Sequence, residues 1–151
     1  MMTHATELFS SIQPLRIAVQ TPHGSLIVPL WFVFQKGCIW CASQGDSTVV
    51  RALQDDPRCA FELSTNEMPY RGIRGRGTVR CLPEVGGQVL EHLIDRYQIN
   101  RDSQLARWLL SRRDTEVAIE ITPVWQSDWD YSQRMTSSRR DVAAQFSEKS
   151  S

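Results

Sequence analysis

The chain of 151 residues is long enough to form one domain with a substantial hydrophobic core. Hydrophobic residues make up 41% of it and charged residues 23%, values that exclude a disordered, collagen-like or coiled-coil protein. Seventeen basic residues balance seventeen acidic ones, so binding to a polyanion would have to rely on a local cluster of positive charge.

The sequence also bears on where the protein works. No apolar run approaches the roughly 20 residues that a membrane-spanning helix needs, and the first thirty residues lack the pattern of a secretion signal. We therefore expect a cytoplasmic protein without a membrane partner. Its four cysteines fit reduced core thiols better than a disulfide framework.

The first third of the chain is predicted to form three strands. Residues 15–20 alternate apolar and polar side chains, a turn follows, and residues 26–34 form a second run, which together indicate a hairpin. The second run is apolar on both faces, so another layer or another subunit should cover its outer face. Pro29 within it favours an edge position or a bulge. A third strand is expected over residues 38–42.

A short helix and two more strands are predicted next. Asp46 or Ser47 is suited to cap a helix that ends before Pro57. Residues 58–64 alternate as a strand with one solvated face, and residues 70–81 form the fifth strand.

The last part of the chain is predicted to hold two helices and a final strand. Apolar residues recur at helical spacing over residues 85–97. A second helix, capped by Ser103, should bury Leu105, Trp108 and Leu109. Residues 116–125 form the sixth strand, and residues 132–151 are predicted to be a flexible C-terminal tail.

These elements predict a mainly β fold, a small six-stranded antiparallel barrel with short helices at its ends. We expect one domain over residues 1–131, followed by the tail. No internal repeat is visible.

The fifth strand carries four arginines: Arg71, Arg74, Arg76 and Arg80. At a period of two, all but Arg71 lie on one face, which is typical of a solvated surface. Arg71 shares the other face with core residues, and it can project over a rim while its stem packs. A bulge at Gly75 would instead send Arg74 inward. Gly75 and Gly77 leave the inner face open to a ligand or a partner's aromatic ring.

Six segments recur in an order that is known from one family: "PLWF", "CAS", "STVVRAL", "LQDDPR", "RGIRGRG" and "SDWD". In this order and spacing, the chain from about residue 15 to 131 resembles the flavin-binding split-barrel proteins related to pyridoxamine 5'-phosphate oxidase. The resemblance implies a homodimeric split barrel with two flavin mononucleotides (FMN) at the subunit interface. A subunit contact would also account for the second strand being apolar on both faces.

The resemblance further implies which residues contact the cofactor. Ser43 and Ser47 match hydroxyl groups that meet the phosphate at the start of the short helix, where N–H groups and the helix dipole favour an anion. Pro29, Leu30 and Trp31 match the strand along the flavin ring. Trp129 matches a late tryptophan at the edge of the cofactor.

The chain departs from this family at the phosphate. The usual Arg-Lys pair aligns with Thr48 and Val49, so both cations are missing. Arg51 could replace them if the helix is rotated, and Arg71 or Arg74 could do so from the neighbouring strand or from the other subunit. If none does, FMN is not the ligand, because hydrogen bonds to charged groups contribute roughly 1.5 to 3 kcal/mol each.

The leading hypothesis is an FMN-dependent oxidoreductase with a small-molecule substrate, in which the cofactor carries the chemistry and no protein residue is assigned as catalytic. The alternative is a non-enzymatic protein on the same fold that binds a flavin, a deazaflavin (F420) or haem. Nucleic-acid binding through the arginine strand is disfavoured by the zero net charge. The three histidines are too scattered to predict a metal site.

Overall fold

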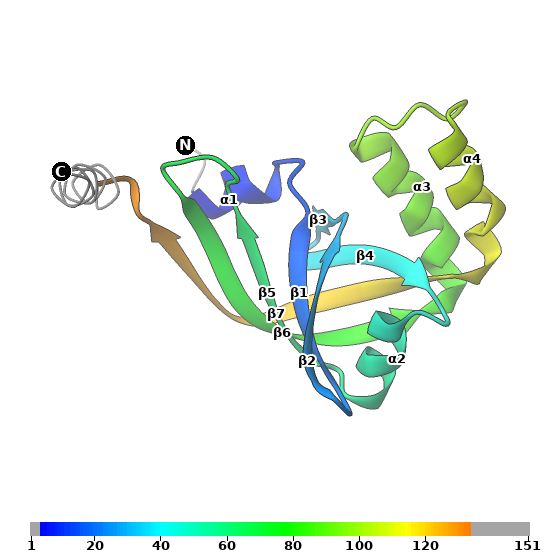
Figure 1. The fold of residues 1–151 in the computed structure, drawn as a ribbon, viewed down its shortest axis with the longest axis horizontal. Helices are drawn as coiled ribbons and strands as arrows, with labels where there is room; N and C mark the ends of the chain where they lie inside the picture. The colour runs from blue at the N-terminus through cyan, green and yellow to red at the C-terminus, as the bar shows by residue number, and fades with distance from the viewer. Residues whose placement is uncertain (1–3, 134–151) are drawn as a thin grey trace, which may run out of the picture.

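The computed structural model describes residues 4–133 (Figure 1). The strands are β1 (Leu15–Thr21), β2 (Gly24–Leu30), β3 (Val33–Gln35), β4 (Cys38–Gln44), β5 (Arg58–Ser64), β6 (Arg71–Leu82) and β7 (Glu116–Asp130). The α-helices are α1 (His4–Phe9), α2 (Thr48–Asp55), α3 (Gly86–Arg96) and α4 (Gln104–Ser111). Two 3₁₀ turns, Pro83–Val85 and Arg113–Thr115, precede α3 and β7.

All strands belong to one antiparallel sheet with the order β2-β1-β5-β6-β7-β4-β3. The predicted mainly β, antiparallel class is confirmed. The predicted count is wrong, since the sheet has seven strands rather than six. β7 pairs with β6 on one side and β4 on the other, so it joins the β2-β1-β5-β6 part of the sheet to the β4-β3 part.

The additional strand arises because the apolar run at residues 26–34 is divided at Trp31 and Phe32. Before this break, β2 pairs with β1 at one edge of the sheet, and after it, β3 pairs with β4 at the opposite edge. Phe32 is fully buried between the two parts. β2 and β3 do not pair, so the sheet remains open, and Pro29 lies on an edge strand as predicted.

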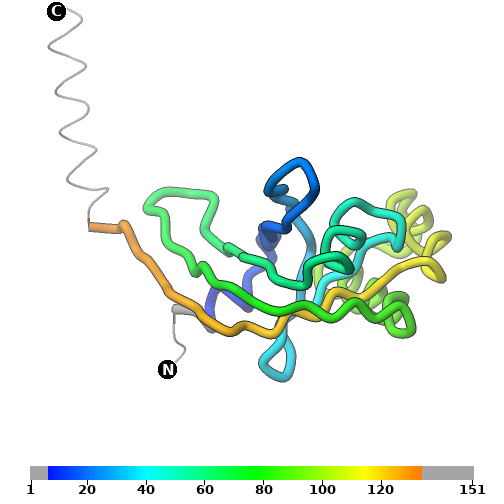
Figure 2. Tube along the Cα trace, turned by 90° about the horizontal axis from the view of Figure 1, so that it is seen from below, coloured from blue at the N-terminus to red at the C-terminus, as the bar shows by residue number. Residues whose placement is uncertain are grey.

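β6 and β7 form a long two-stranded ribbon, visible in Figure 2 as the adjacent green and orange tubes. β7 runs to Asp130, five residues beyond the predicted end. The ribbon's irregularity lies opposite Arg76 and Gly77, where β7 has one additional residue, Val124. β6 therefore keeps its alternation, and Arg74 points outward as the regular pattern predicts.

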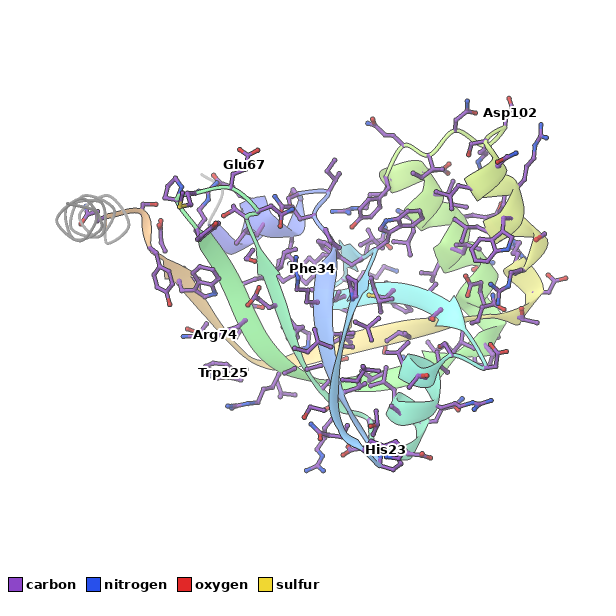
Figure 3. All side chains as sticks on the ribbon, viewed as in Figure 1. His23, Phe34, Glu67, Arg74, Asp102 and Trp125 are labelled. Carbon is purple, nitrogen blue, oxygen red and sulfur yellow. The ribbon has the colours of Figure 1, made fainter. Side chains whose placement is uncertain are left out.

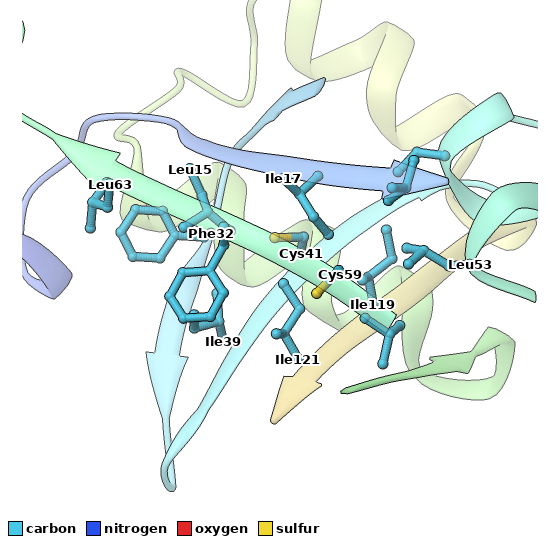
Figure 4. Close-up of a cluster of buried hydrophobic side chains, with 14 of the residues drawn as sticks. Leu15, Ile17, Phe32, Ile39, Cys41, Leu53, Cys59, Leu63, Ile119 and Ile121 are labelled. Atoms are coloured by element: carbon cyan, nitrogen blue, oxygen red, sulfur yellow. The ribbon is translucent and has the colours of Figure 1, made fainter. Parts of the chain in front are cut away.

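The core fills the concave side of the sheet (Figure 4). It includes Leu15 and Ile17 of β1, Phe32, and Ile119 and Ile121 of β7, all of which are fully buried. The four cysteines are free, as predicted, but only Cys41 and Cys59 are buried in this core, whereas Cys38 and Cys81 are partly exposed. α3 covers the opposite face of β7, which explains why residues 116–121 are buried on both faces.

α4 differs from the prediction. Ser103 caps it, since its Oγ accepts a hydrogen bond from the N–H of Ala106 at 3.1 Å. However, Leu105 is 45% exposed and Trp108 54% exposed, and Ala106 is the buried residue of this helix. The apolar stripe of α4 therefore faces outward, next to the hollow described below.

The N-terminal helix α1 was not predicted. Arg96 of α3 holds the segment that follows it, because its Nη2 donates hydrogen bonds to the carbonyl oxygens of Phe9 and Ser11 at 3.0 and 2.6 Å. The same guanidinium lies 4.6 Å from the ring centroid of Phe32. This contact ties α1 and α3 to the buried break between β2 and β3.

Among residues 4–133, no helix has the length and apolar character to cross a membrane. The predicted flexible tail lies outside the described residues, apart from Ser132 and Gln133.

Candidate functional site

A hollow of about 450 Å³ lies at the start of α2, and we call it the α2 pocket. It is bounded by the end of β4, the N-terminus of α2, the last turn of α4 and the start of β7. β3 pairs with β4 only as far as Trp40, so in the described chain residues 41–44 have a strand partner on the β7 side alone. The lining residues are Ala42, Ser43, Gln44, Asp46, Ser47, Trp108, Leu109, Arg112 and Glu116.

One wall of the α2 pocket presents hydrogen-bond donors. Ser47 caps α2 by accepting a hydrogen bond from the N–H of Val50 at 3.3 Å, and the Ser43 hydroxyl donates to Ser47 Oγ at 3.0 Å. The N–H groups of Thr48 and Val49 belong to the first turn and have no acceptor within the helix. Together with the positive end of the helix dipole, they favour an anion here.

The opposite wall supplies a positive charge. Among the described residues that line the α2 pocket, Arg112 alone is a cation. Its guanidinium carbon lies over the Trp108 ring, 4.8 Å from the centroid, which is a cation–π contact. Its carbonyl oxygen accepts hydrogen bonds from Gln44 Nε2 and Thr115 Oγ1, both at 3.0 Å. The end of α4 is thereby fixed against β4.

The pocket also contains a buried carboxyl group. Glu116 is 6% exposed, and its Oε2 atom has no hydrogen-bond partner. Burial raises the pKa of Glu116 above its ordinary value, while Gln44 and the positive charge of Arg112 act in the opposite direction. The pocket therefore combines hydroxyls, a cation and one acid whose charged form is disfavoured.

The structure brings only part of the predicted cofactor site together here. Ser43 and Ser47 line the α2 pocket, and Thr48 is the first residue of α2. Arg51 is exposed on α2 and does not line the pocket. The suggestion that Arg51 replaces the missing cations is thus not supported by its position.

Pro29, Leu30 and Trp31 do not line the α2 pocket. Pro29 is exposed on the edge strand β2, and Leu30 packs against the core. Trp31 stacks on Tyr97, with 5.1 Å between the ring centroids. Within one chain, these three residues belong to a different edge of the sheet from Ser43.

Arg71 and Arg74 also lie outside the α2 pocket. Arg71 projects at the rim, as expected, where its Nη1 lies 3.5 Å from Glu7 Oε2. Arg74 is on the outer face of the long ribbon, on the far side of the molecule from α2 and α4 (Figure 3). Within one chain, neither can supply the cation at the start of α2.

The other two arginines of β6 make contacts on the outer face of the sheet. Arg80 forms a two-pronged ion pair with Glu120, with N···O distances of 2.7 and 3.0 Å. The guanidinium of Arg76 lies 4.9 Å from the Trp125 ring centroid. Arg80 and Arg76 therefore have partners within the chain, a carboxylate and an aromatic ring.

Trp129 lies in a second hollow, of about 310 Å³, near the far end of the ribbon. It packs directly over Gly72, where a Cβ atom would come within 2.6 Å of the indole. Tyr70, Tyr131 and Arg16 line the same hollow. Within one chain, Trp129, which was predicted to contact the cofactor edge, therefore lies in a different hollow from Ser43 and Ser47, which were predicted to contact the phosphate.

The sequence analysis missed Arg112, Glu116 and the exposed position of Trp108. The pairing of β4 with β7, in which Gln44 lies opposite Glu116, brings them to Ser43 and Ser47. The only local signal is the run "SRRDTE" ahead of the last strand, and nothing in it indicates its partner strand.

No protein-family model matches the chain, and no curated protein matches it. Among solved structures, it is similar to an F420 reductase, with 19% identity, a TM-score of 0.69, and coverage of 84% of this chain and 98% of that one. A pyridoxamine 5'-phosphate oxidase-like protein from Listeria innocua gives 10% identity, a TM-score of 0.63 and coverages of 81% and 92%. A haem storage protein from Vibrio cholerae gives 12% identity, a TM-score of 0.62, and coverage of 82% of this chain and 89% of that one.

These similarities confirm the resemblance to flavin-binding split-barrel proteins at the level of the fold. The solved structures that share this fold include an F420 reductase, an FAD-binding protein and a haem storage protein.

Proposed function

We propose that the protein binds the phosphate end of FMN in the α2 pocket and acts as an FMN-dependent oxidoreductase on a small-molecule substrate. The observation that carries this proposal is the convergence of two hydroxyls, free helix N–H groups and the Arg112 guanidinium on one hollow. These donor types suit a phosphate, because charge-assisted hydrogen bonds are the strong ones. Arg112 takes the role that the missing Arg-Lys pair leaves open.

The chemistry would come from the bound flavin, which accepts and donates electrons. Ser43, Ser47 and the first turn of α2 would hold the phosphate, and the Trp108 and Leu109 side chains would shield one side of the ligand from water. No residue of the chain is assigned a proton-transfer step with the substrate.

We further propose that the protein is a cytoplasmic homodimer. In one chain, the outer face of the edge strand β2 exposes Ile27, which is 66% accessible, next to Pro29. A second chain on this face would bury that apolar surface. It would also provide a second copy of Pro29, Leu30, Trp31 and Trp129, which a single chain does not bring to the α2 pocket.

A carrier of deazaflavin or haem is the second candidate. Arg112 is the one cation among the described residues that line the pocket, which is little for a phosphate dianion. The structural similarity to an F420 reductase and to a haem storage protein supports this second candidate.

Absorbance spectroscopy tests the proposal. The purified protein is mixed with FMN or with riboflavin, which has the same ring without the phosphate, and is then desalted. We expect the visible flavin band to be retained with FMN and lost with riboflavin. Retention of neither would contradict FMN binding, and retention of both would contradict recognition through the phosphate. A Soret band in the purified protein would favour the haem carrier.

A further inference from the structure

Glu116 shares the α2 pocket with the groups that attract an anion, although a carboxylate repels one. It is the first residue of β7, lies opposite Gln44 of β4, and lines the same hollow as Ser43, Ser47 and Arg112. Its side chain is almost fully buried, and one carboxyl oxygen has no hydrogen-bond partner. Such a group is costly as an anion unless a positive charge stands close to it.

The surroundings of Glu116 provide little compensation besides Arg112. From β4 the carboxyl group meets the neutral amide of Gln44, and on the α3 side Gly86, which has no side chain, packs on the backbone of Glu116. In the 3₁₀ turn before β7, Arg113 is engaged by Glu91 at 2.8 Å and Asp114 is exposed. Across the pocket, Asp46 is exposed and also negative.

Without a ligand, Arg112 is the cation that can offset a charge on the buried Glu116, while Asp46 is exposed to solvent. Arg112 offsets an ionised Glu116, and the first turn of α2 adds a partial positive charge. If a phosphate enters, it competes for Arg112 and places a second negative charge next to the carboxylate. Like charges at close range raise the affinity of one of them for a proton.

We propose that a phosphate-terminated ligand binds in the α2 pocket together with one proton, which Glu116 takes up. The complex then holds a neutral carboxyl group that can donate a hydrogen bond, while Arg112 turns its full charge to the phosphate. This inference rests on the proposed anion site. In this scheme, Glu116 determines how much the affinity for a phosphate dianion falls as the pH rises.

The direction of the pH dependence follows from linkage. Because the complex holds the proton more tightly than the free protein, acid favours binding and alkali opposes it. Between the pKa of Glu116 in the free protein and its higher pKa in the complex, the affinity should fall about tenfold for each pH unit. Burial, which raises this pKa, moves the onset of that fall toward neutral pH.

Fluorescence titration with FMN at several pH values tests the inference, with Glu116→Gln as the matched variant. Between about pH 7 and 9 a phosphate monoester is mostly a dianion, so its own titration contributes little. We expect the wild-type Kd to rise about tenfold per unit at the alkaline end, while Glu116→Gln binds at least tenfold more tightly there with a nearly flat profile. Parallel profiles for the two proteins would overturn the inference.

Calorimetry in two buffers of different ionisation enthalpy counts the protons directly. We expect about one proton to be taken up per FMN by the wild-type protein at pH 8 and none by Glu116→Gln. The wild-type measurement decides the matter even if the variant does not fold. Binding without proton uptake would overturn the role of Glu116 and leave the proposed function standing, whereas absence of FMN binding at every pH would overturn both.

Discussion

Arg112 is the residue whose position most changes the interpretation of the sequence. The start of α2 has the hydroxyls of an anion site but lacks cations at Thr48 and Val49. Arg112 lines the same hollow from the end of α4, where its carbonyl oxygen accepts a hydrogen bond from Gln44 and its guanidinium lies over the Trp108 ring. In the proposed site, the cation therefore comes from a different element.

We expect Arg112→Ala to weaken FMN binding strongly. A hydrogen bond to a charged group contributes about 1.5 to 3 kcal/mol, so the Kd should rise roughly 10- to 100-fold. Arg51→Ala is the matched control, because it also removes one arginine but Arg51 does not line the pocket. Fluorescence titration at one pH and ionic strength measures both variants. Equal losses of affinity would show that general charge, and not this guanidinium, attracts the phosphate.

At the scale of single residues, the sequence predicted features that depend on nearby residues in the chain, and it missed those that depend on which strands pair. Ser43 and Ser47 were named because the sequence around the start of the short helix resembles the split-barrel family, and the structure places their hydroxyl groups 3.0 Å apart. Arg112 and Glu116 could not be identified from the sequence, because their proximity to Ser43 and Ser47 depends on the register between β4 and β7. The exposed face of the arginine strand was predicted correctly from its period of two, but the ion pair of Arg80 with Glu120 requires the β6–β7 pairing.

Among the elements, α3 and β7 approach each other unusually closely. A Cβ atom at Gly86 would lie 1.9 Å from the carbonyl oxygen of Glu116 and 2.3 Å from its carbonyl carbon. Both of these are backbone atoms, so a flexible side chain cannot relieve the contact. Glycine at this position allows the first turn of α3 to lie directly on the start of β7.

Gly86→Ala should therefore lower the stability of the fold. Overpacking typically reduces the free energy of unfolding by about 1 to 3 kcal/mol, which corresponds to a melting temperature lower by roughly 3 to 10 °C. Thermal unfolding followed by circular dichroism measures the change. Gly45→Ala is the control, because a Cβ there would come no closer than 3.4 Å to its neighbours and should cost little. An unchanged melting temperature for Gly86→Ala would show that α3 can shift away from β7.

The elements also show where a sequence pattern is insufficient. Most strands and three helices were predicted near their observed bounds, because alternation and capping residues are local signals. The continuous run at residues 26–34 was read as one strand, since apolar periodicity does not reveal that the chain changes from one sheet edge to the other. α4 was given a buried stripe, yet Trp108 and Leu109 of that stripe border a pocket and Leu105 is exposed.

At the scale of the whole molecule, the outer face of β2 is the surface that a second copy would cover. Ile27→Glu places a charge in this face, and burial of an unpaired charge is strongly unfavourable. Size-exclusion chromatography with light scattering should give about twice the chain mass of 17.3 kDa for the wild-type protein and the single chain mass for the variant.

Ile12→Glu is the matched control for the dimer, because Ile12 is equally exposed, at 68%, but lies outside β2. It should leave the mass unchanged. A wild-type protein that runs as a single chain would contradict the homodimer, and an Ile27→Glu dimer would place the interface on another surface.

The pairing of β7 with both β6 and β4 has a consequence for how the protein is made. A nascent chain synthesised only to residue 115 contains β2-β1-β5-β6 as one group and β4-β3 as another, with no strand between them. Among the described strands, β7, which unites them, is the last to be synthesised. Completion of the sheet is therefore delayed until synthesis has passed β7, and the two walls of the α2 pocket come together only after that point.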